Sequence, residues 1–289
     1  MRPLVIVGAS GLRGRAVLDL ATDVIPCLAR DPRFTHRRAR VLRGELEHLP
    51  DGLFPEEEHV VLHFAVDPRA PRANVEGTRR LLAALDPSRT KGVIYASSAS
   101  VYGSPPFEQV SETASVVPTT DLARSRAESE RLLLDWARAT GRSAILLRTR
   151  FLVASGEREV AGALRKLARV PFVPGSGKQR FSVLSAEAFG RSALALVEQI
   201  HDAHEPLRGP LNLGWTGTPA LAPLLDALAP RMRIPLRLGP LLRLAGLELA
   251  ACEQTLDVTR AVTCHGLSFL ERSPGEATAE IAAILRGAA

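Results

Sequence analysis

The sequence predicts an α/β fold in which a doubly wound parallel β-sheet is followed by a smaller C-terminal subdomain. Two observations lead to this prediction. Short apolar runs alternate with helical patterns along the first 150 residues, which is the order of strands and crossover helices in a parallel sheet. After residue 150 the alternation gives way to loops rich in proline and glycine and to short helical pieces.

Each element of the sheet region has a local signal. The apolar run Leu4-Val5-Ile6-Val7 is rich in β-branched residues, as buried parallel strands are. Apolar residues recur at helical spacing from 73 to 85 and from 121 to 140, and Gly141 ends the second helix. A further helix is expected from 187 to 200. The other strands are expected at 24–29, 40–42, 60–65, 93–96, 144–147 and 211–213.

The same pattern divides the chain into two domains. The doubly wound sheet is expected in residues 1–150, and residues 188–214 are expected to return to it. Residues 151–187 and 215–289 are expected to form the smaller subdomain.

The composition excludes several classes of protein. With 46% hydrophobic and 24% charged residues among 289, the chain is neither disordered nor fibrous. No apolar run approaches the roughly 18 residues that span a bilayer, and the N-terminus shows no signal-peptide pattern. Three scattered cysteines are too few for a disulfide framework or a zinc site. We therefore expect a soluble, cytoplasmic protein with no membrane partner and no metal.

The net charge of +6 raises the question of a nucleic-acid partner. The arginines are interleaved with acids along the whole chain, so a solvated arginine-rich surface explains the charge and no nucleic acid is expected. One cluster also allows a second interpretation, as an anion site. It consists of Arg30, Arg33, Arg37, Arg38, Arg40 and Arg43.

A glycine-rich turn connects the first strand to the first helix. Gly8, Gly11 and Gly14 permit a tight turn, a close approach of the backbone to a pyrophosphate, and packing of the helix on the strand. The N-terminus of the helix adds free N–H groups and a positive dipole. The turn therefore predicts a dinucleotide site, and a purely structural turn is the alternative.

The end of the second strand bears on which dinucleotide is bound. At this place an acid would accept the adenosine 2′-hydroxyl, whereas an arginine favours a 2′-phosphate. Arg30 stands there, so NADP(H) is the preferred cofactor and NAD(H) the alternative. Arg30 could instead only stack on the adenine.

Further motifs follow in order along the chain. They are Gly44-Glu45-Leu46, His63-Phe64-Ala65-Val66, Asn74-Val75-Glu76-Gly77-Thr78, Ser97-Ser98-Ala99-Ser100-Val101-Tyr102-Gly103, Pro174-Gly175-Ser176-Gly177, Phe181-Ser182-Val183-Leu184 and Asp257-Val258-Thr259-Arg260-Ala261. With the glycine turn, they make the chain resemble an extended short-chain dehydrogenase/reductase of the NAD-dependent epimerase/dehydratase type.

This resemblance implies a Rossmann-type domain that binds the cofactor and a smaller subdomain that binds a small-molecule substrate. It also implies which residues contact the cofactor. These are Gly8, Ser10, Gly11, Leu12, Gly14, Arg30, Glu45, Leu46, Phe64, Ala65, Val66, Asn74 and Arg126.

In that family a serine, a tyrosine and a lysine carry the chemistry. The serine position falls on Ser98, which would hydrogen-bond the reacting oxygen, although a local capping role is the alternative. The Tyr-x-x-x-Lys pair falls on Leu122 and Arg126. Leucine has no proton to give, and an arginine cannot exchange one near neutral pH, although it can hold ribose hydroxyls. The standard proton relay is therefore expected to be absent.

Tyr102 is the candidate to replace that relay. The chain has only two tyrosines, and the other, Tyr95, lies within a predicted buried strand. Family members carry a tyrosine at the position of Tyr102 besides the catalytic one, so water or a substrate group remains a second route. The expected catalytic residues are Ser98, Tyr102 and Arg126. Substrate contacts are expected from Ser100, Leu122, Arg150 and Phe151, with a surface salt bridge as the alternative for Arg150.

Together these features predict an NADP(H)-dependent oxidoreductase or epimerase-like enzyme acting on a small metabolite, a biosynthetic intermediate. Two alternatives remain open: a non-redox cyclase or isomerase on the same scaffold, and a dinucleotide-binding protein without turnover. Relatives of this type often pair through the helices that correspond to 73–85 and 121–140, so a homodimer is also among the expectations.

Overall fold

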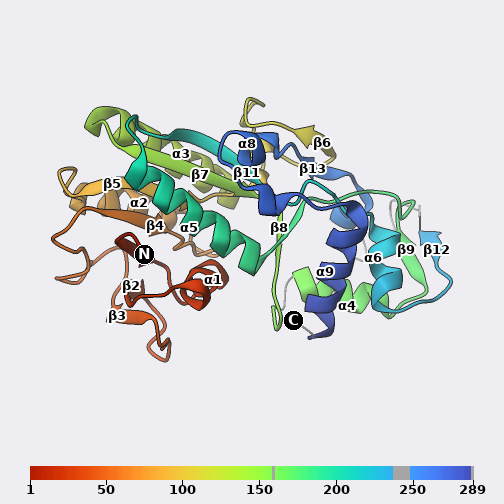
Figure 1. Ribbon diagram of the computed structural model, residues 1–289. Coiled ribbons are helices and arrows are strands. Elements are labelled where there is room, and N and C mark those ends of the chain that lie inside the picture. The colour runs from red at the N-terminus through yellow and green to blue at the C-terminus, as the bar shows by residue number, and fades with distance from the viewer. Residues whose placement is uncertain (158–159, 237–247, 288–289) are drawn as a thin grey trace. The chain divides into compact units, whose positions relative to one another are not determined.

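The computed structural model describes residues 1–157, 160–236 and 248–287 (Figure 1). It divides into two compact units. The first unit contains Met1–Gly103, Ser115–Arg148 and Glu187–Leu211, and the second contains Ser104–Ala114, Thr149–Ala186 and Asn212–Ala289. This division differs from the sequence-based one at residues 104–114, because strand β6 (Phe107–Val110) pairs with β13 (Gln254–Leu256) in the second unit.

A seven-stranded sheet forms the centre of the first unit, in the order β11-β7-β5-β4-β1-β2-β3. Neighbouring strands pair in parallel from β3 through to β7. This confirms the predicted doubly wound α/β fold. The strands are β1 (Leu4–Val7), β2 (Ile25–Ala29), β3 (Ala39–Arg43), β4 (His59–His63), β5 (Thr90–Ala96), β7 (Ser143–Thr149) and β11 (Arg208–Leu213).

The strand order places a switch point between β1 and β4. After β1 the chain adds β2 and β3 on one side, and then it crosses over to add β4 and β5 on the other. In open α/β sheets, ligands bind in the crevice outside the carboxyl ends of the strands at such a point.

Helices cover both faces of this sheet (Figure 1). On one face α1 (Leu12–Leu20) meets α5 (Ala186–Asp202), where a Cβ on Gly190 would lie 2.5 Å from the carbonyl oxygen of Ala16. On the other face α2 (Pro71–Ala84) packs beside α3 (Asp121–Thr140). The expected helix from 121 to 140 is confirmed, since Gly141 ends it in the left-handed conformation, with φ of 71°.

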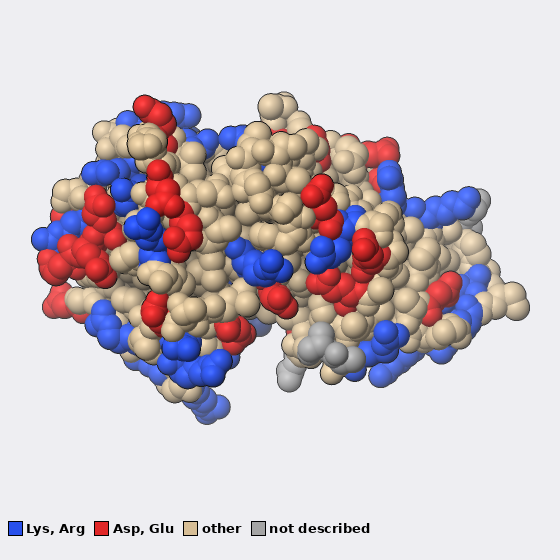
Figure 2. Space-filling view, viewed as in Figure 1, with Lys and Arg blue, Asp and Glu red and all other residues tan. Residues whose placement is uncertain are grey.

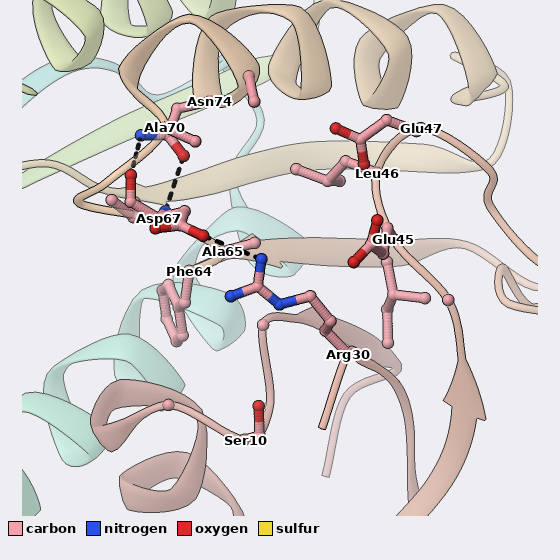
Figure 3. Close-up of a pocket in the computed structure, with 16 residues that line it drawn as sticks. Ser10, Arg30, Glu45, Leu46, Glu47, Phe64, Ala65, Asp67, Ala70 and Asn74 are labelled. Atoms are coloured by element: carbon pink, nitrogen blue, oxygen red, sulfur yellow. Dashed lines mark hydrogen bonds and ion pairs between the residues drawn. The ribbon is translucent and has the colours of Figure 1, made fainter. Parts of the chain in front are cut away.

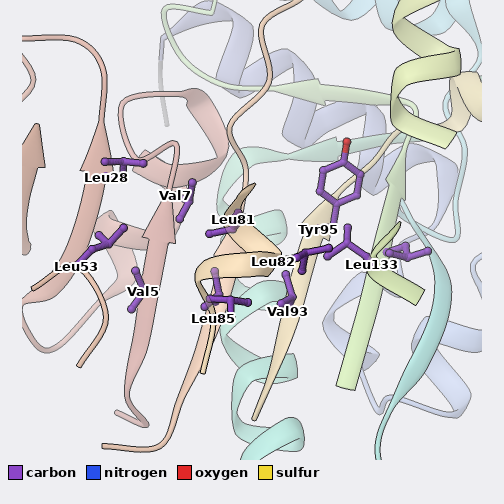
Figure 4. Close-up of a cluster of buried hydrophobic side chains, with 12 residues drawn as sticks. Val5, Val7, Leu28, Leu53, Leu81, Leu82, Leu85, Val93, Tyr95 and Leu133 are labelled. Atoms are coloured by element: carbon purple, nitrogen blue, oxygen red, sulfur yellow. The ribbon is translucent and has the colours of Figure 1, made fainter. Parts of the chain in front are cut away.

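The core of the first unit explains the continuous apolar runs in the sequence. Strands β1, β4 and β7 are buried along their whole length, as parallel strands covered on both faces must be. A cluster of buried side chains fills the space between the sheet and α2 and α3 (Figure 4). Its members are Val5, Val7, Leu28, Leu53, Val61, Leu81, Leu82, Leu85, Val93, Tyr95, Leu133 and Leu146.

The second unit contains short parallel strand pairs and helices. The sequence pattern indicated only helical pieces beyond residue 214, so β12 and β13 were missed, because three residues carry no readable periodicity. The pairs are β8 (Phe151–Val153) with β10 (Val183–Ser185), β9 (Phe172–Pro174) with β12 (Ile234–Leu236), and β6 with β13; the helices are α4 (Val160–Ala168), α6 (Leu221–Leu228), α8 (Thr259–Thr263) and α9 (Pro274–Arg286). Within the described residues, no helix combines the length and the apolarity that crossing a bilayer requires.

Candidate functional site

A cavity of about 340 Å³ opens in the first unit at the carboxyl ends of β1, β2 and β4 (Figure 3). It coincides with the switch point of the sheet, and its volume lies in the range of small-molecule and cofactor sites, about 300–1,000 Å³. It brings together most of the predicted cofactor residues, whereas Leu12, Gly14 and Arg126 are not part of its lining. The lining consists of Gly8, Ser10, Gly11, Leu28, Arg30, Gly44, Glu45, Leu46, Glu47, Phe64, Ala65, Val66, Asp67, Ala70, Ala73 and Asn74.

The structural reason for glycine differs among the three positions of the turn. Gly8 has φ of +96°, and a Cβ there would lie 2.5 Å from the backbone nitrogen of Ala65. A Cβ on Gly14 would lie 2.5 Å from Cα of Ala9. Gly11 is different, since its Cβ would meet only the carbonyl oxygen of Gly8, at 3.5 Å, an ordinary contact. The packing of the protein therefore requires two of the glycines, whereas Gly11 leaves open space in the cavity.

That open space lies beside the N-terminus of α1. Gly11 is the N-cap residue of this helix, and no side chain caps the first-turn amides. Backbone N–H groups at a helix N-terminus attract anions, because they lack intrahelical partners and lie at the positive end of the helix dipole. The turn thus has the geometry that a dinucleotide pyrophosphate requires.

The opposite wall of the cavity is shaped by α2 and the loop before it. The side-chain amide of Asn74 accepts a hydrogen bond from the backbone nitrogen of Asp67 (2.7 Å) and donates one to its carbonyl oxygen (2.9 Å). Gly77 lets Leu46 approach α2, since a Cβ there would lie 2.7 Å from Cδ1 of Leu46. The Asn-Val-x-Gly-Thr motif therefore positions the loops that line the cavity.

An ion pair crosses the cavity (Figure 3). Nη1 of Arg30, at the end of β2, lies 3.0 Å from Oδ2 of Asp67, in the loop after β4. Hydrogen bonds from the backbone of Arg69 and from Arg30 hold the pKa of Asp67 below its usual range, so the carboxylate is ionised. Sequence reasoning predicted Arg30 and missed Asp67, which lies 37 residues away and carries no motif.

Ser98 and Ser100 lie just beyond the carboxyl end of β5. Oγ of Ser98 accepts a hydrogen bond from the backbone nitrogen of Ser100 (3.2 Å) and so caps the 3-10 helix Ala99–Tyr102. Both serines are partly exposed. The capping role considered from the sequence is therefore present, and it leaves the Ser98 hydroxyl proton available to another acceptor.

Arg126 reaches the same end of the sheet from α3. Its Nη1 donates to the carbonyl oxygen of Ala96 (3.1 Å), the side chain is largely buried, and burial lowers its pKa. Leu122, one turn earlier on α3, is partly exposed. A second guanidinium, Arg13 of α1, was not predicted: its pKa is lowered to about 10, first by burial and then by the charge of Arg126. Two cations therefore lie near each other at this edge.

Tyr102 has a charged neighbour that the sequence did not reveal. It is 8% exposed, and the guanidinium of Arg148 lies 4.8 Å from the centre of its ring. Arg148 is held by Glu130 of α3 through Nε (3.0 Å) and Nη2 (2.5 Å), and Ser97 donates to the same carboxylate. One feature of the sequence indicated this cluster: a glutamate, Glu130, lies four residues after Arg126 on the same predicted helix.

Tyr95, in contrast, belongs to the core. It is 1% exposed, its ring lies 5.1 Å from that of His63, and burial raises its pKa. Burial also lowers the pKa of His63 to about 4, so this histidine is neutral near pH 7. Both groups are packing residues of the sheet, as the sequence suggested for Tyr95.

Arg150 and Phe151, the other predicted substrate residues, belong to the second unit. Nε of Arg150 donates to Oε1 of Gln254 (2.6 Å), and its guanidinium lies 4.4 Å from the centre of the Phe151 ring. No carboxylate of the described residues pairs with Arg150, so the surface salt bridge considered from the sequence is not formed. In the part of the chain that the structure describes, no group of histidine, cysteine, aspartate or glutamate side chains could hold a metal ion.

Comparison with solved structures agrees with this architecture. A UDP-galactose 4-epimerase superposes with a TM-score of 0.74 at 21% identity over 99% of both chains. A UDP-glucuronic acid 4-epimerase from Bacillus cereus, solved with NAD, gives 0.73 at 16% identity over 98% of this chain and 95% of that one. RMD from Pseudomonas aeruginosa, solved with NADPH, gives 0.69 at 21% identity over 98% of both. At these identities the likeness shows the fold alone.

The family of the chain is shown by comparison of its sequence with family models. No curated protein matches the chain. The model of the NAD dependent epimerase/dehydratase family, however, matches residues 4–207, which include the glycine turn, the cavity and the Ser98 region. The chain therefore belongs to the NAD dependent epimerase/dehydratase family.

Proposed function

We propose that the chain binds a nicotinamide dinucleotide in the cavity of the first unit and acts as an NADP(H)-dependent, epimerase-like oxidoreductase on a small metabolite. The observation that carries this proposal is the open space beside Gly11 at the uncapped N-terminus of α1, because it fits a pyrophosphate. Several solved structures of the same fold are sugar-nucleotide 4-epimerases, which supports a metabolite of that class.

In the proposed mechanism the nicotinamide would supply or accept a hydride, and the residues of the chain would handle the proton. Ser98 can donate a hydrogen bond from its hydroxyl to the substrate oxygen, since its Oγ acts only as acceptor toward Ser100. Arg126, placed where family members carry the lysine, would hold the ribose hydroxyls. Tyr102, whose ring lies against the Arg148 guanidinium, would give or take the proton.

A protein that binds the dinucleotide without turnover is the second candidate. It is favoured by Leu122, which has no proton where the family tyrosine is expected, and by the burial of Tyr102. The two candidates share the cofactor site and differ in the proton step.

Binding of the dinucleotide tests both candidates. A ligand at 100 times its Kd stabilises the folded state by about 2.7 kcal/mol, which for a chain of this size raises Tm by roughly 4–5 °C. The full chain should show such a rise with NADPH or NADH. If neither raises Tm at millimolar concentration, both candidates are wrong.

Replacing Tyr102 by phenylalanine separates the two candidates. If Tyr102 is the proton donor, turnover of NADPH with a panel of ketones and keto sugars should fall about hundredfold or more, because a general acid contributes about 10²–10⁴ to the rate. The Kd of NADPH should stay unchanged, since the tyrosine is not part of the cavity lining. If Tyr102→Phe and the wild type turn over NADPH equally fast, the Tyr102 phenol is not the proton donor. If neither protein turns over NADPH, the candidate that binds the dinucleotide without turnover is favoured.

The cofactor preference should respond to Asp67. The proposed NADP(H) preference requires Arg30 to exchange its bond to Asp67 for one to the 2′-phosphate. Asp67→Asn should therefore lower the Kd of NADPH relative to that of NADH about two- to fivefold, a modest effect because Arg30 is exposed. Arg30→Ala should shift the ratio the opposite way. Titrations of both variants with both cofactors check this, and equal changes for NADPH and NADH would show that Arg30 does not contact a 2′-phosphate.

A further inference from the structure

Arg13 is a charged residue in the first turn of α1 that the proposed mechanism does not use. Its guanidinium carbon lies 5.7 Å from the centre of the Phe189 ring. Phe189 in turn meets Phe64, which lines the cavity, with the two ring centres 5.4 Å apart. The Nε of Arg13 is buried, whereas the residue as a whole is partly exposed. Arg13 therefore lies close to the wall of the cavity at the end of β4, where a ligand can reach it.

Arg126 brings a second positive charge to the same place. Its Nη1 donates to the carbonyl oxygen of Ala96, the last residue of β5 (3.1 Å). Because β4 and β5 pair in parallel, Phe64 and Ala96 lie side by side at the carboxyl ends of these strands. Burial and then the charge of Arg126 lower the pKa of Arg13 to about 10, which leaves both side chains cationic at neutral pH. The two guanidiniums thus repel each other.

Two neighbouring ionisable groups leave this positive charge in place. The charge of Glu130 acts on Arg126, but this carboxylate is bonded to Arg148 (2.5 Å). The phenol of Tyr95 interacts with both Arg13 and Arg126, but burial raises its pKa, so it is neutral at neutral pH. Neither group offsets the field of the two guanidiniums.

The order of the strands indicates which part of a dinucleotide would meet these charges. The 2′-phosphate of the adenosine is proposed beside Arg30 at the end of β2, and the pyrophosphate beside Gly11 at the N-terminus of α1. A dinucleotide lies across the switch point of such a sheet, and beyond β1 the next strands are β4 and β5. The nicotinamide half is therefore expected at the ends of β4 and β5, where Arg13 and Arg126 lie.

We propose that Arg13, together with Arg126, makes the site prefer the reduced form of the nicotinamide. The oxidised ring carries a positive charge and the reduced ring is neutral, so the two guanidiniums repel only the oxidised ring. This repulsion is strong where little water or salt screens it. The inference rests on the proposed function, because it concerns the cofactor of that site. The protein would be loaded with NADPH when both forms are present in equal amounts.

The test compares the Kd of NADPH with that of NADP⁺, measured calorimetrically on the full chain. NADH and NAD⁺ are compared instead if that pair binds more tightly. The wild type should bind the reduced form about tenfold or more tightly than the oxidised form. Arg13→Met, a neutral side chain of similar length that can still pack on the Phe189 ring, should lower this ratio about three- to tenfold. Arg13→Lys keeps the charge and should keep the ratio within about twofold.

Arg15→Met is the matched control. Arg15 stands on the same helix but is exposed, so water screens its charge, and the ratio should stay within about twofold of the wild-type value. The Tm of each protein without cofactor shows that it is folded. Should Arg13→Met not fold, Arg126→Met removes the other charge and should lower the ratio in the same way.

The outcomes separate the redox preference from the cofactor site itself. A preference for the reduced form that Arg13→Met weakens and Arg13→Lys retains supports the proposal. Equal binding of both forms by the wild type, an unchanged ratio after removal of the charge, or an equally large loss in Arg13→Lys or Arg15→Met overturns it and leaves the cofactor site standing. If none of the four dinucleotides binds, the cofactor site is wrong and this proposal is wrong with it.

Discussion

Replacing Glu130 by alanine should destabilise the protein by about 3–5 kcal/mol, since this is the usual cost of removing one partner of a buried ion pair. The side chains of Arg148 and Glu130 are only 4% and 5% exposed, and two hydrogen bonds join them; no other carboxylate of the described residues pairs with Arg148, so the variant would leave it as a buried, uncompensated charge. Ser97 would lose its acceptor as well. Urea unfolding of the full chain measures the change.

Glu128, on the same helix, supplies the matched control. It pairs with Arg131 on the surface, where both side chains are more than a third exposed, and such pairs contribute about 0–1 kcal/mol. Glu128→Ala should therefore change the free energy of unfolding by less than about 1 kcal/mol. A loss of similar size in the two variants would mean that helix propensity or surface charge, and not the buried pair, accounts for the effect at Glu130.

Two glycines of the turn should respond differently to replacement by alanine: Gly14→Ala should lose stability, whereas Gly11→Ala should lose cofactor affinity. In Gly14→Ala the new Cβ would lie 2.5 Å from Cα of Ala9, so the strand and helix must move apart, at a cost of about 1–3 kcal/mol. The sign of this change in unfolding free energy is informative, because helix propensity alone favours alanine over glycine by about 1 kcal/mol. Thermal unfolding without cofactor should show the loss.

Gly11→Ala should leave that stability nearly unchanged, because its Cβ meets only the Gly8 carbonyl oxygen at van der Waals distance. The same Cβ would occupy the space proposed for the pyrophosphate, so the Kd of NADPH and NADH should rise at least about tenfold. Titration of both cofactors checks this. Unaltered affinity in a folded Gly11→Ala protein would place the phosphates elsewhere.

Much of the first unit was predictable because its signals are local. A buried parallel strand must be apolar throughout, so β1 could be identified from four consecutive residues. The helix α3 could be bounded because Gly141 takes a left-handed conformation that few other residues adopt. The strands β12 and β13 could not be predicted, because a segment of three residues fits many patterns. These segments form strands only by pairing with partners far along the chain.

The same distinction applies to the residues of the candidate sites, some of which are close together in the sequence and others far apart. The glycine turn and Arg30 stand in one stretch of chain, and their spacing alone pointed to the cavity. The partner of Arg30 comes from 37 residues away, and Gln254, which holds Arg150, from 104 residues away. No spacing rule connects such pairs, because loop lengths and not periodicity separate them.

By itself, the sequence determined the doubly wound sheet and the glycine turn, because backbone sterics and hydrophobic period act between near neighbours. Only the tertiary structure decided which charges are compensated. Arg148 has Glu130, Arg30 has Asp67, and Arg150 has a neutral amide. Electrostatic energy depends on distance and burial in space, and folding sets both.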